Sequence, residues 1–287
     1  MPFTPEPTAD GSYTFFSEEF GEWFHSREGA YAEAHQTYVA VTQLASRAVA
    51  EEIVLLDICY GLGYNTAAAL EAIWQVNPAC GVTVQALEID AAVPKSAVSN
   101  HLTKAWSEPV QTALAALATH QQIKALPQRA LEATLLIGDA RQTIQTLVDK
   151  GYQADAIFLD PFSPTRCPQL WTVEFIQQVA RCLKADGCLA TYSCAAAVRT
   201  ALQQAGLSIG STQAAGRRWP GTVASYAALD LPPLSPQEQA HLQTRASVPY
   251  RDPTLQGTAA DIVAARKQAQ ALSTLQPTGQ WRRRWLS

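Results

Sequence analysis

The chain has 287 residues, of which 47% are hydrophobic and 16% are charged, and its formal net charge is −4. These values are typical of a soluble globular protein with a sizeable core, and the length argues against two full domains. The first ten residues lack the basic and apolar regions of a signal peptide, and no stretch approaches the roughly 20 apolar residues of a membrane span. We therefore expect a cytoplasmic protein without a membrane segment.

The cysteine spacing bears on the state of the thiols, and the charge distribution bears on contacts with phosphate. The six cysteines include no C-x-x-C pair, so we expect reduced thiols and neither a disulfide framework nor a metal site. Residues 217–287 carry nine Lys and Arg against four Asp and Glu, whereas the preceding part carries twelve against twenty-one. A basic end on an acidic body is either a surface that contacts phosphate or a solvated tail.

In chain order, residues 1–50 predict an extension that holds a short hairpin and an amphipathic helix. Residues 51–231 then alternate strands and helices. Strands are predicted at 53–57, 82–88, 134–139, 154–160 and 188–193, and helices at 66–75, 141–150, 172–184 and 195–205. This alternation is typical of an α/β fold with a parallel, doubly wound sheet.

Two features depart from a simple alternation. Residues 91–132 are mostly helical and much longer than a crossover requires, so we expect a helical insertion. Two strands at 207–214 and 223–229 predict a closing antiparallel hairpin, which favours the Rossmann-like class I methyltransferase sheet over a dinucleotide fold. Residues 232–287 follow as a basic C-terminal tail.

A glycine-rich turn after the first strand predicts a nucleotide-type cofactor site. The strand ends at Asp57, and Gly61, Leu62 and Gly63 lead through Asn65 into a helix. Glycine lets the backbone pass close to a ligand where a Cβ would collide, and ligands of such sheets lie at these strand ends. Because the dinucleotide fingerprint requires a third glycine further on, S-adenosylmethionine fits better than NAD or FAD.

Carboxylates stand at the ends of four successive strands: Asp57, Glu88, Asp139 and Asp160. Glu88 suits the ribose hydroxyls of the cofactor, and Asp139, with Ala140 after it, suits the adenine amino group. Asp57 could pair with the sulfonium or amino end, directly or through water. The alternative is that each carboxylate only caps the helix that follows its strand.

Asp160 also opens the turn Asp-Pro-Phe-Ser-Pro, which we expect to form a rigid rim at the cofactor mouth. Methylation of a nitrogen requires an unprotonated amine held in line with the methyl group, so an acceptor for its N–H groups and a wall behind it are sufficient. Asp160 is therefore the predicted catalytic residue. The alternative is a structural turn in which Asp160 is a cap.

The chain resembles the methyltransferase half of the MnmC family, which takes part in the biosynthesis of 5-methylaminomethyl-2-thiouridine in tRNA, nearly from end to end. The motifs that carry this resemblance lie at residues 9–12, 15–20, 25–30, 57–65, 158–164, 168–171, 189–193 and 216–218. The resemblance implies S-adenosylmethionine-dependent methylation of the aminomethyl nitrogen on the wobble uridine, in the anticodon region of tRNA. It also matches Asp160 to the proposed catalytic aspartate of the family. The bifunctional relatives carry a second, FAD-dependent oxidoreductase domain that this sequence lacks, so another enzyme would supply the aminomethyl substrate.

Residues expected to contact the tRNA are aromatic or basic. They are Phe16, Phe162, Arg166, Trp171, Arg217 and Arg218, with Arg199 and Arg282 to Arg284 as further candidates for phosphate contacts. The N-terminal aromatic rings could instead pack in the core, and each arginine could be solvated. Two other functions remain open at this stage, a nicotinamide-dependent Rossmann oxidoreductase and a non-catalytic tRNA-binding module on a methyltransferase fold.

Overall fold

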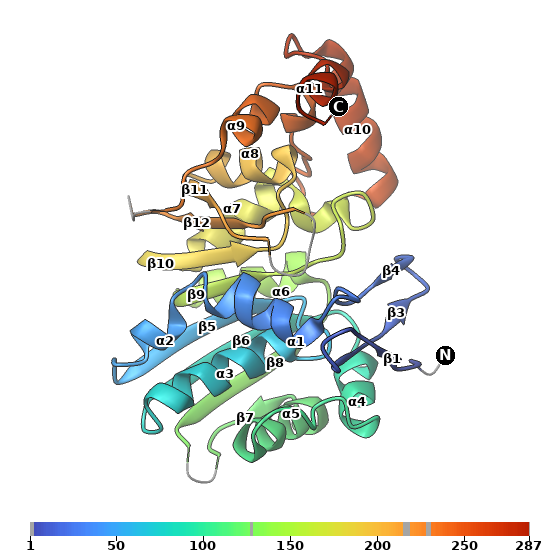
Figure 1. Ribbon diagram of the computed structural model, residues 1–287. Coiled ribbons are helices and arrows are strands. Elements are labelled where there is room, and N and C mark those ends of the chain that lie inside the picture. The colour runs from blue at the N-terminus through green and yellow to red at the C-terminus, as the bar shows by residue number, and fades with distance from the viewer. Residues whose placement is uncertain (1–2, 127–128, 215–218, 228–230, 287) are drawn as a thin grey trace.

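An eight-stranded mixed sheet forms the centre of the molecule (Figure 1). The computed structural model describes residues 3–126, 129–214, 219–227 and 231–286. The strand order is β11-β12-β10-β9-β5-β6-β8-β7. These strands are β5 (Glu52–Ile58), β6 (Gly81–Glu88), β7 (Gln122–Ile123), β8 (Leu131–Ile137), β9 (Ala154–Leu159), β10 (Leu183–Thr191), β11 (Ser208–Ser211) and β12 (Thr222–Ser225).

The five strands from β8 to β10 run parallel, and β12 pairs antiparallel with both β10 and β11. This arrangement confirms the predicted parallel sheet with a closing antiparallel hairpin. The strand β5 lies between β9 and β6, and most of its residues are apolar and buried, as is typical of a parallel strand covered on both faces. The carboxyl ends of β5, β6, β8 and β9 therefore meet at one edge of the sheet.

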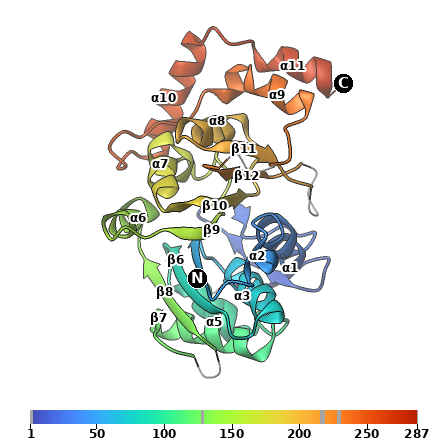
Figure 2. The same cartoon turned by 90° about the vertical axis from the view of Figure 1, so that its left-hand side faces the viewer.

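Helices cover both faces of the sheet (Figure 2). One layer holds α1 (Ala30–Glu33), α2 (Leu44–Arg47), α3 (Tyr64–Val76) and α5 (Glu108–His120), and the other holds α6 (Ala140–Asp149), α7 (Val173–Arg181) and α8 (Ala196–Gln204). Each layer buries its own apolar cluster against the sheet. None of the helices in the described ranges combines the length and apolar character that a membrane crossing needs.

The N-terminal extension is more broken than its pattern predicts. Two small hairpins pair β1 (Glu6–Pro7) with β2 (Tyr13–Thr14) and β3 (Phe16–Ser17) with β4 (Glu22–Trp23). The single helix expected after them is divided into α1, a π-helical segment η1 (Ala34–Val39) and α2. The division before α2 falls at Gln43, whose left-handed conformation at φ 56° ends the preceding turn.

The insertion and the tail each contain structure that the sequence pattern did not specify. The insertion holds α4 (Ala92–Ser99), α5 and the edge strand β7, which is too short to show a two-residue period. The tail holds α9 (Pro236–Leu242), the 3-10 turn η3 (Arg245–Ser247), α10 (Ala259–Leu272) and α11 (Thr278–Trp285). Trp281 docks α11, because its ring stacks on His241 and its Nε1 donates to the carbonyl of Gln237.

Candidate active site

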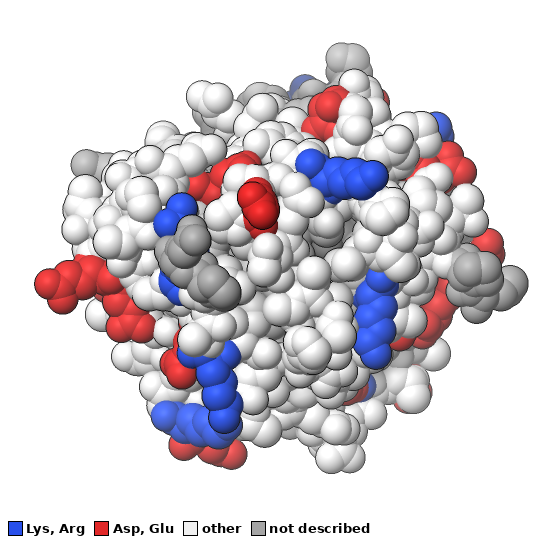
Figure 3. Space-filling model, turned by 90° about the horizontal axis from the view of Figure 1, so that it is seen from below, with Lys and Arg blue, Asp and Glu red and all other residues white. Residues whose placement is uncertain are grey.

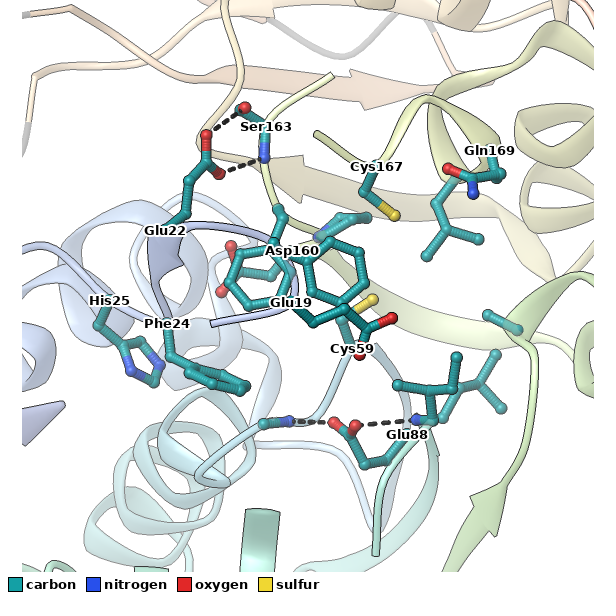
Figure 4. Close-up of a pocket in the computed structure, with 18 of the residues that line it drawn as sticks. Glu19, Glu22, Phe24, His25, Cys59, Glu88, Asp160, Ser163, Cys167 and Gln169 are labelled. Atoms are coloured by element: carbon teal, nitrogen blue, oxygen red, sulfur yellow. Dashed lines mark hydrogen bonds between the residues drawn. The ribbon is translucent and has the colours of Figure 1, made fainter. Parts of the chain in front are cut away.

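A cavity of about 580 Å³ opens at the carboxyl edge of the sheet, between the β3–β4 hairpin and the ends of the parallel strands (Figure 4). Glycine-turn and strand-end residues line one part of it, including Gly61, Glu88, Asp139 and Ala140. The other part is lined by the hairpin and by the turn that begins at Asp160. Six of the residues that the sequence singled out line the cavity: Gly61, Glu88, Asp139, Ala140, Asp160 and Phe162.

The glycine turn is tied to Glu88. The carboxylate of Glu88 accepts the N–H of Gly61 at 2.7 Å and the N–H groups of Ile89 and Asp90 at 2.8 and 2.9 Å. Burial raises the pKa of Glu88, although these three backbone bonds act in the opposite direction. A carboxylate has acceptor sites for about four hydrogen bonds, so Glu88 keeps capacity for a hydroxyl group in the cavity.

Both turn glycines have left-handed backbones, with φ 56° at Gly61 and 85° at Gly63. A Cβ on Gly61 would lie 3.4 Å from the Phe24 ring, and one on Gly63 would lie 2.5 Å from the Tyr60 hydroxyl. Gly61 lines the cavity, whereas Gly63 and Leu62 lie behind it. Only Gly61 therefore offers direct close approach to a ligand, and Gly63 shapes the turn.

Asp57 lies below the cavity floor and does not line it. Its side chain is fully buried and accepts the Thr66 hydroxyl at 2.6 Å through Oδ2, while Oδ1 has no hydrogen-bond partner among the described residues. Burial raises the pKa of Asp57 to about 7, against the bonds from Thr66, and the nearby Glu88 raises it further. Asp57 is thus buried beside the first turn of α3, where it holds the Thr66 side chain.

Asp139 caps α6 and faces the cavity. Its Oδ1 accepts the backbone N–H of Arg141 at 2.9 Å, and the Arg141 guanidinium donates to both carboxylate oxygens. Burial would raise the pKa of Asp139, but the bonds from Arg141 outweigh it and hold that pKa below its usual value. Asp139 therefore caps α6 and also lines the cavity, so the two alternatives that the sequence offered for it hold together.

Asp160 stands at the end of β9, and its carboxylate points into the cavity (Figure 4). Asn65 donates from Nδ2 to Asp160 Oδ2 at 2.8 Å, so the first turn of α3 fixes the carboxylate across the sheet. The hydroxyl of Tyr192, the residue that follows β10, donates to the carbonyl of Pro161 at 2.9 Å. Asn65 itself does not line the cavity, and it acts on the site through Asp160.

Aromatic rings form the wall beside Asp160. Phe162 stacks on Phe20 with ring centroids 4.5 Å apart and meets the edge of Phe24 at 5.1 Å. Trp171 is fully buried and donates from Nε1 to the carbonyl of Phe162 at 2.8 Å. Its ring has no surface for a base, so the expectation of a tRNA contact there was wrong, and Trp171 supports Phe162 instead. Phe16 is partly exposed and packs on Trp23 outside the cavity.

The hairpin is fastened to this wall by Glu22. Its carboxylate accepts the Ser163 hydroxyl at 2.5 Å and the Ser163 backbone N–H at 2.9 Å (Figure 4). Arg166 lies 4.0 Å from the same carboxylate, and its half-exposed side chain lies outside the cavity. Phe24 was one of the N-terminal rings, with Phe15, Phe16 and Trp23, for which stacking on a uridine or packing in the core stayed open. Glu22 and Phe20 were not selected from the sequence as site residues, and the role of Glu22 depends on a contact 141 positions along the chain. Their only local signal was the aromatic, acidic segment of residues 15–24.

The basic residues expected to meet phosphate divide into three groups. Arg217 and Arg218 lie outside the described residues. Arg199 is only 2% exposed and pairs with Glu238 at 2.7 Å, so its assignment as a phosphate contact was wrong. Arg282, Arg283 and Arg284 are exposed on α11. On the face that Figure 3 shows, Lys and Arg are scattered among Asp and Glu and form no continuous basic patch.

The comparisons with known proteins agree with this geometry. A family profile described as S-adenosyl-L-methionine-dependent methyltransferase matches residues 100–227. The crystal structure of MnmC2 from Aquifex aeolicus is 30% identical in sequence, has a TM-score of 0.80, and is matched over 94% of this chain and 85% of that chain. The chain belongs to the MnmC2 family.

As an MnmC2 family member, the chain is an S-adenosyl-L-methionine-dependent methyltransferase. This membership overturns the nicotinamide-dependent alternative. Two further relatives are named tRNA 5-methylaminomethyl-2-thiouridine biosynthesis bifunctional protein MnmC. The one from Ralstonia nicotianae is 30% identical over 78% of this chain, and the one from Azoarcus sp. is 31% identical over 73%. The chain spans about a third of the length of these relatives, since it covers 34% of each.

The cavity residues fit S-adenosyl-L-methionine. Gly61 allows backbone approach, and Glu88 retains acceptor capacity for a ribose hydroxyl. Asp139 is an acceptor held at the far side of the cavity, where an adenine amino group could donate to it.

Proposed function

We propose that the protein methylates the nitrogen of a 5-aminomethyl group on the wobble uridine of tRNA, producing 5-methylaminomethyluridine. The names of the MnmC relatives support the tRNA substrate. The observation that carries the proposal is the mouth of the cavity, where Asp160 stands against the stacked Phe162 and Phe20 rings. An aromatic wall suits a uracil base, and a fixed carboxylate suits an amine.

The bound cofactor supplies an activated methyl group on sulfur. Asp160 accepts an N–H bond from the substrate amine, so that the nitrogen lone pair faces the methyl group, and it receives or relays the proton that the nitrogen releases. Asn65 keeps the carboxylate in one orientation through the 2.8 Å bond. Phe162, Phe20 and Phe24 exclude water and limit the positions of the base. These contacts act mainly by orientation and proton transfer.

The charge of the cavity lining also favours an amine. Glu19, Glu22 and Asp160 line the acceptor side, against Arg27 on the same side. An aminomethyl group is a cation in solution, so this acidic side attracts it before it loses its proton. A carboxymethylated amine carries an additional anion that the same side would repel. The proposal therefore requires that an upstream enzyme supply tRNA with a free aminomethyl group, and such a tRNA substrate implies a cytoplasmic location.

The anticodon region is the proposed contact because the wobble uridine lies there. A base stacked in the anticodon loop must leave its stack to enter the cavity, at a cost of about a few kcal/mol. The exposed arginines of α11 would contact the phosphates of the same tRNA.

The test is a nucleoside assay. Purified protein is incubated with S-adenosylmethionine and with tRNA that carries 5-aminomethyluridine at the wobble position, and the nucleosides are then analysed by mass spectrometry. We expect a gain of one methyl group on that nucleoside and none on tRNA carrying the carboxymethylated form. Cofactor binding without methylation of the aminomethyl tRNA would overturn the proposed substrate.

A further inference from the structure

The C-terminal tail reaches the cofactor half of the cavity through a single arginine. Residues 250–258, here called the tail loop, lie against the start of α6 and precede α10. Tyr250 pairs with Thr172, at the start of α7, and Glu174 accepts the backbone N–H of Asp252 at 2.8 Å. Ile262, on α10, is buried in the core beside the loop. The tail loop is therefore part of the packed molecule.

Arg141 divides its guanidinium between the cavity and the tail loop. The Nε and Nη2 groups donate to the Asp139 carboxylate, at 2.7 Å for the shortest bond. The Nη1 group donates to Asp252 Oδ2 at 3.1 Å and to the carbonyl of Gly257 at 2.9 Å. The Arg141 side chain is 12% exposed and lines the cavity with Asp139. One rigid planar group thus joins two carboxylates that are 113 positions apart in the sequence.

Asp252 is held firmly in this position. It is 3% exposed, and its carboxylate accepts the Gly257 N–H through both oxygens at 3.1 Å. The Thr254 hydroxyl and the Gln256 N–H donate to its Oδ1 at 3.2 and 3.3 Å. A Cβ on Gly257 would lie 3.0 Å from that same oxygen, so the loop closes tightly around the carboxylate. A buried carboxylate with this many donors is a fixed anchor for Arg141.

We propose that Arg141 is a positioning residue through which the tail loop sets the enzyme's affinity and base specificity for the adenosine part of its cofactor. This inference rests on the proposed adenine contact at Asp139. Asp252 and Gly257 hold the guanidinium, and the guanidinium in turn holds the Asp139 carboxylate with an acceptor toward the cavity. Without the anchor, Asp139 keeps its cap to the Arg141 N–H but loses its fixed orientation. The tail is then a component of the cofactor site and not an appendage to it.

The test measures cofactor binding and not methylation. Calorimetry with S-adenosylhomocysteine, and with the analogue whose adenine is replaced by hypoxanthine, gives an affinity and a base preference for each variant. Hypoxanthine has a carbonyl where adenine has the amino group, so its exocyclic position cannot donate to Asp139. We expect Arg141→Lys and Asp252→Asn each to weaken S-adenosylhomocysteine binding by about tenfold, in line with a lost hydrogen bond to a charged group. Both should also lower the preference for adenine toward that of Asp139→Asn.

Arg199 and Glu238 supply the matched control. They form another buried Arg to carboxylate pair between the core and the tail, at 2.7 Å, and neither lines the cavity. Arg199→Lys and Glu238→Gln should lower the melting temperature without changing either affinity. Equal affinity losses in both pairs would reduce Arg141 to a general structural role and overturn the inference.

Two further outcomes distinguish a failure of this inference from a failure of the adenine contact at Asp139 or of the proposed methylation. Normal affinity and preference in Arg141→Lys and Asp252→Asn, beside weak binding in Asp139→Asn, would overturn the link through the tail while the adenine contact stands. Normal binding in Asp139→Asn would remove the adenine contact and the inference together. Neither outcome depends on tRNA, so a failed methylation assay leaves the binding test intact. If Asp252→Asn does not fold, the binding measurements on Arg141→Lys alone test the inference. Lysine keeps the positive charge at this position but cannot bond both carboxylates through one planar group.

Discussion

The two halves of the cavity are built in different ways. The cofactor half comes from strand ends and the turns directly after them, and backbone N–H groups fix its carboxylates, as Gly61, Ile89 and Asp90 do at Glu88. The acceptor half is assembled from distant segments, since Glu22 reaches Ser163 and Asn65 reaches Asp160. A shared sheet edge is enough to make the first half, whereas the second needs the N-terminal hairpin to dock. Cofactor binding and methyl transfer should therefore respond separately to substitution.

The substitution of Asp160, in the acceptor half, should give the largest difference between the effect on methyl transfer and the effect on cofactor binding. Asp160→Ala should lower the methylation rate by about 10²- to 10⁴-fold, the range for the loss of a general base. Cofactor affinity should change little, because Glu88 and Asp139 are the proposed contacts. Single-turnover methylation of tRNA with the aminomethyl nucleoside, together with calorimetry on the same protein, measures both. A near-normal rate would remove Asp160 from the mechanism, and a complete loss of cofactor binding would move it to the cofactor half.

The buried Asp57, in the cofactor half, should make the stability of the protein depend on pH. Its pKa is raised to about 7, so between about pH 4 and 7 the folded protein holds a proton that the unfolded chain has released. The contribution of this side chain to stability is therefore present at low pH and is lost as the pH rises to 7. Asp57→Asn is neutral at every pH and should be more stable than the parent at pH 8, by up to about 4 kcal/mol.

At pH 4 the variant and the parent should differ much less in stability, because Asp57 is then protonated in the folded state and still partly protonated in the unfolded chain. Urea unfolding at both pH values measures the difference. A difference in the free energy of unfolding that is the same at pH 4 and pH 8 would contradict the raised pKa.

Gly63 tests whether the turn itself, and not only its contacts, supports the cofactor. Gly63→Ala places a side chain at φ 85° and 2.5 Å from the Tyr60 hydroxyl, so the turn must move. The strain is on the order of 1–3 kcal/mol, which would weaken S-adenosylhomocysteine binding by about 5- to 150-fold if it falls on the bound state. Gly151→Ala is the matched control, because Gly151 is also left-handed at φ 66° but has open space around it. Equal affinity in the two variants would show that the turn tolerates the change.

The smallest expected effects concern tRNA and the exposed arginines of α11. Replacing Arg282, Arg283 or Arg284 with Ala should flatten the slope of log K against log salt by about 0.7 to 0.9 for each lost phosphate contact. The variant Arg181→Ala, at an exposed position on α7, should leave the slope unchanged. Fluorescence titration of tRNA at several salt concentrations gives these slopes. Slopes identical to that of the parent in all three variants would make the basic helix a solvated surface.

The cofactor half was largely predictable because its signals are local. The apolar strand, the glycine turn and the acidic strand ends lie within short segments, and parallel strands bring their carboxyl ends to one edge by geometry alone. The sequence therefore determined the parallel sheet, its closing hairpin and the positions of Glu88, Asp139 and Asp160. It also placed Asp57 at a strand end, but it could not show that this side chain is completely buried.

The acceptor half and the role of the tail were decided by the tertiary structure alone. Burial separates Trp171, which supports a ring from behind, from Phe162, which lines the cavity, although both are aromatic residues of one segment. The contacts of Glu22 with Ser163 and of Arg141 with Asp252 join residues more than a hundred positions apart. No periodicity or motif encodes such pairs, because a side chain's partner depends on how whole elements pack and not on its own neighbours in the sequence.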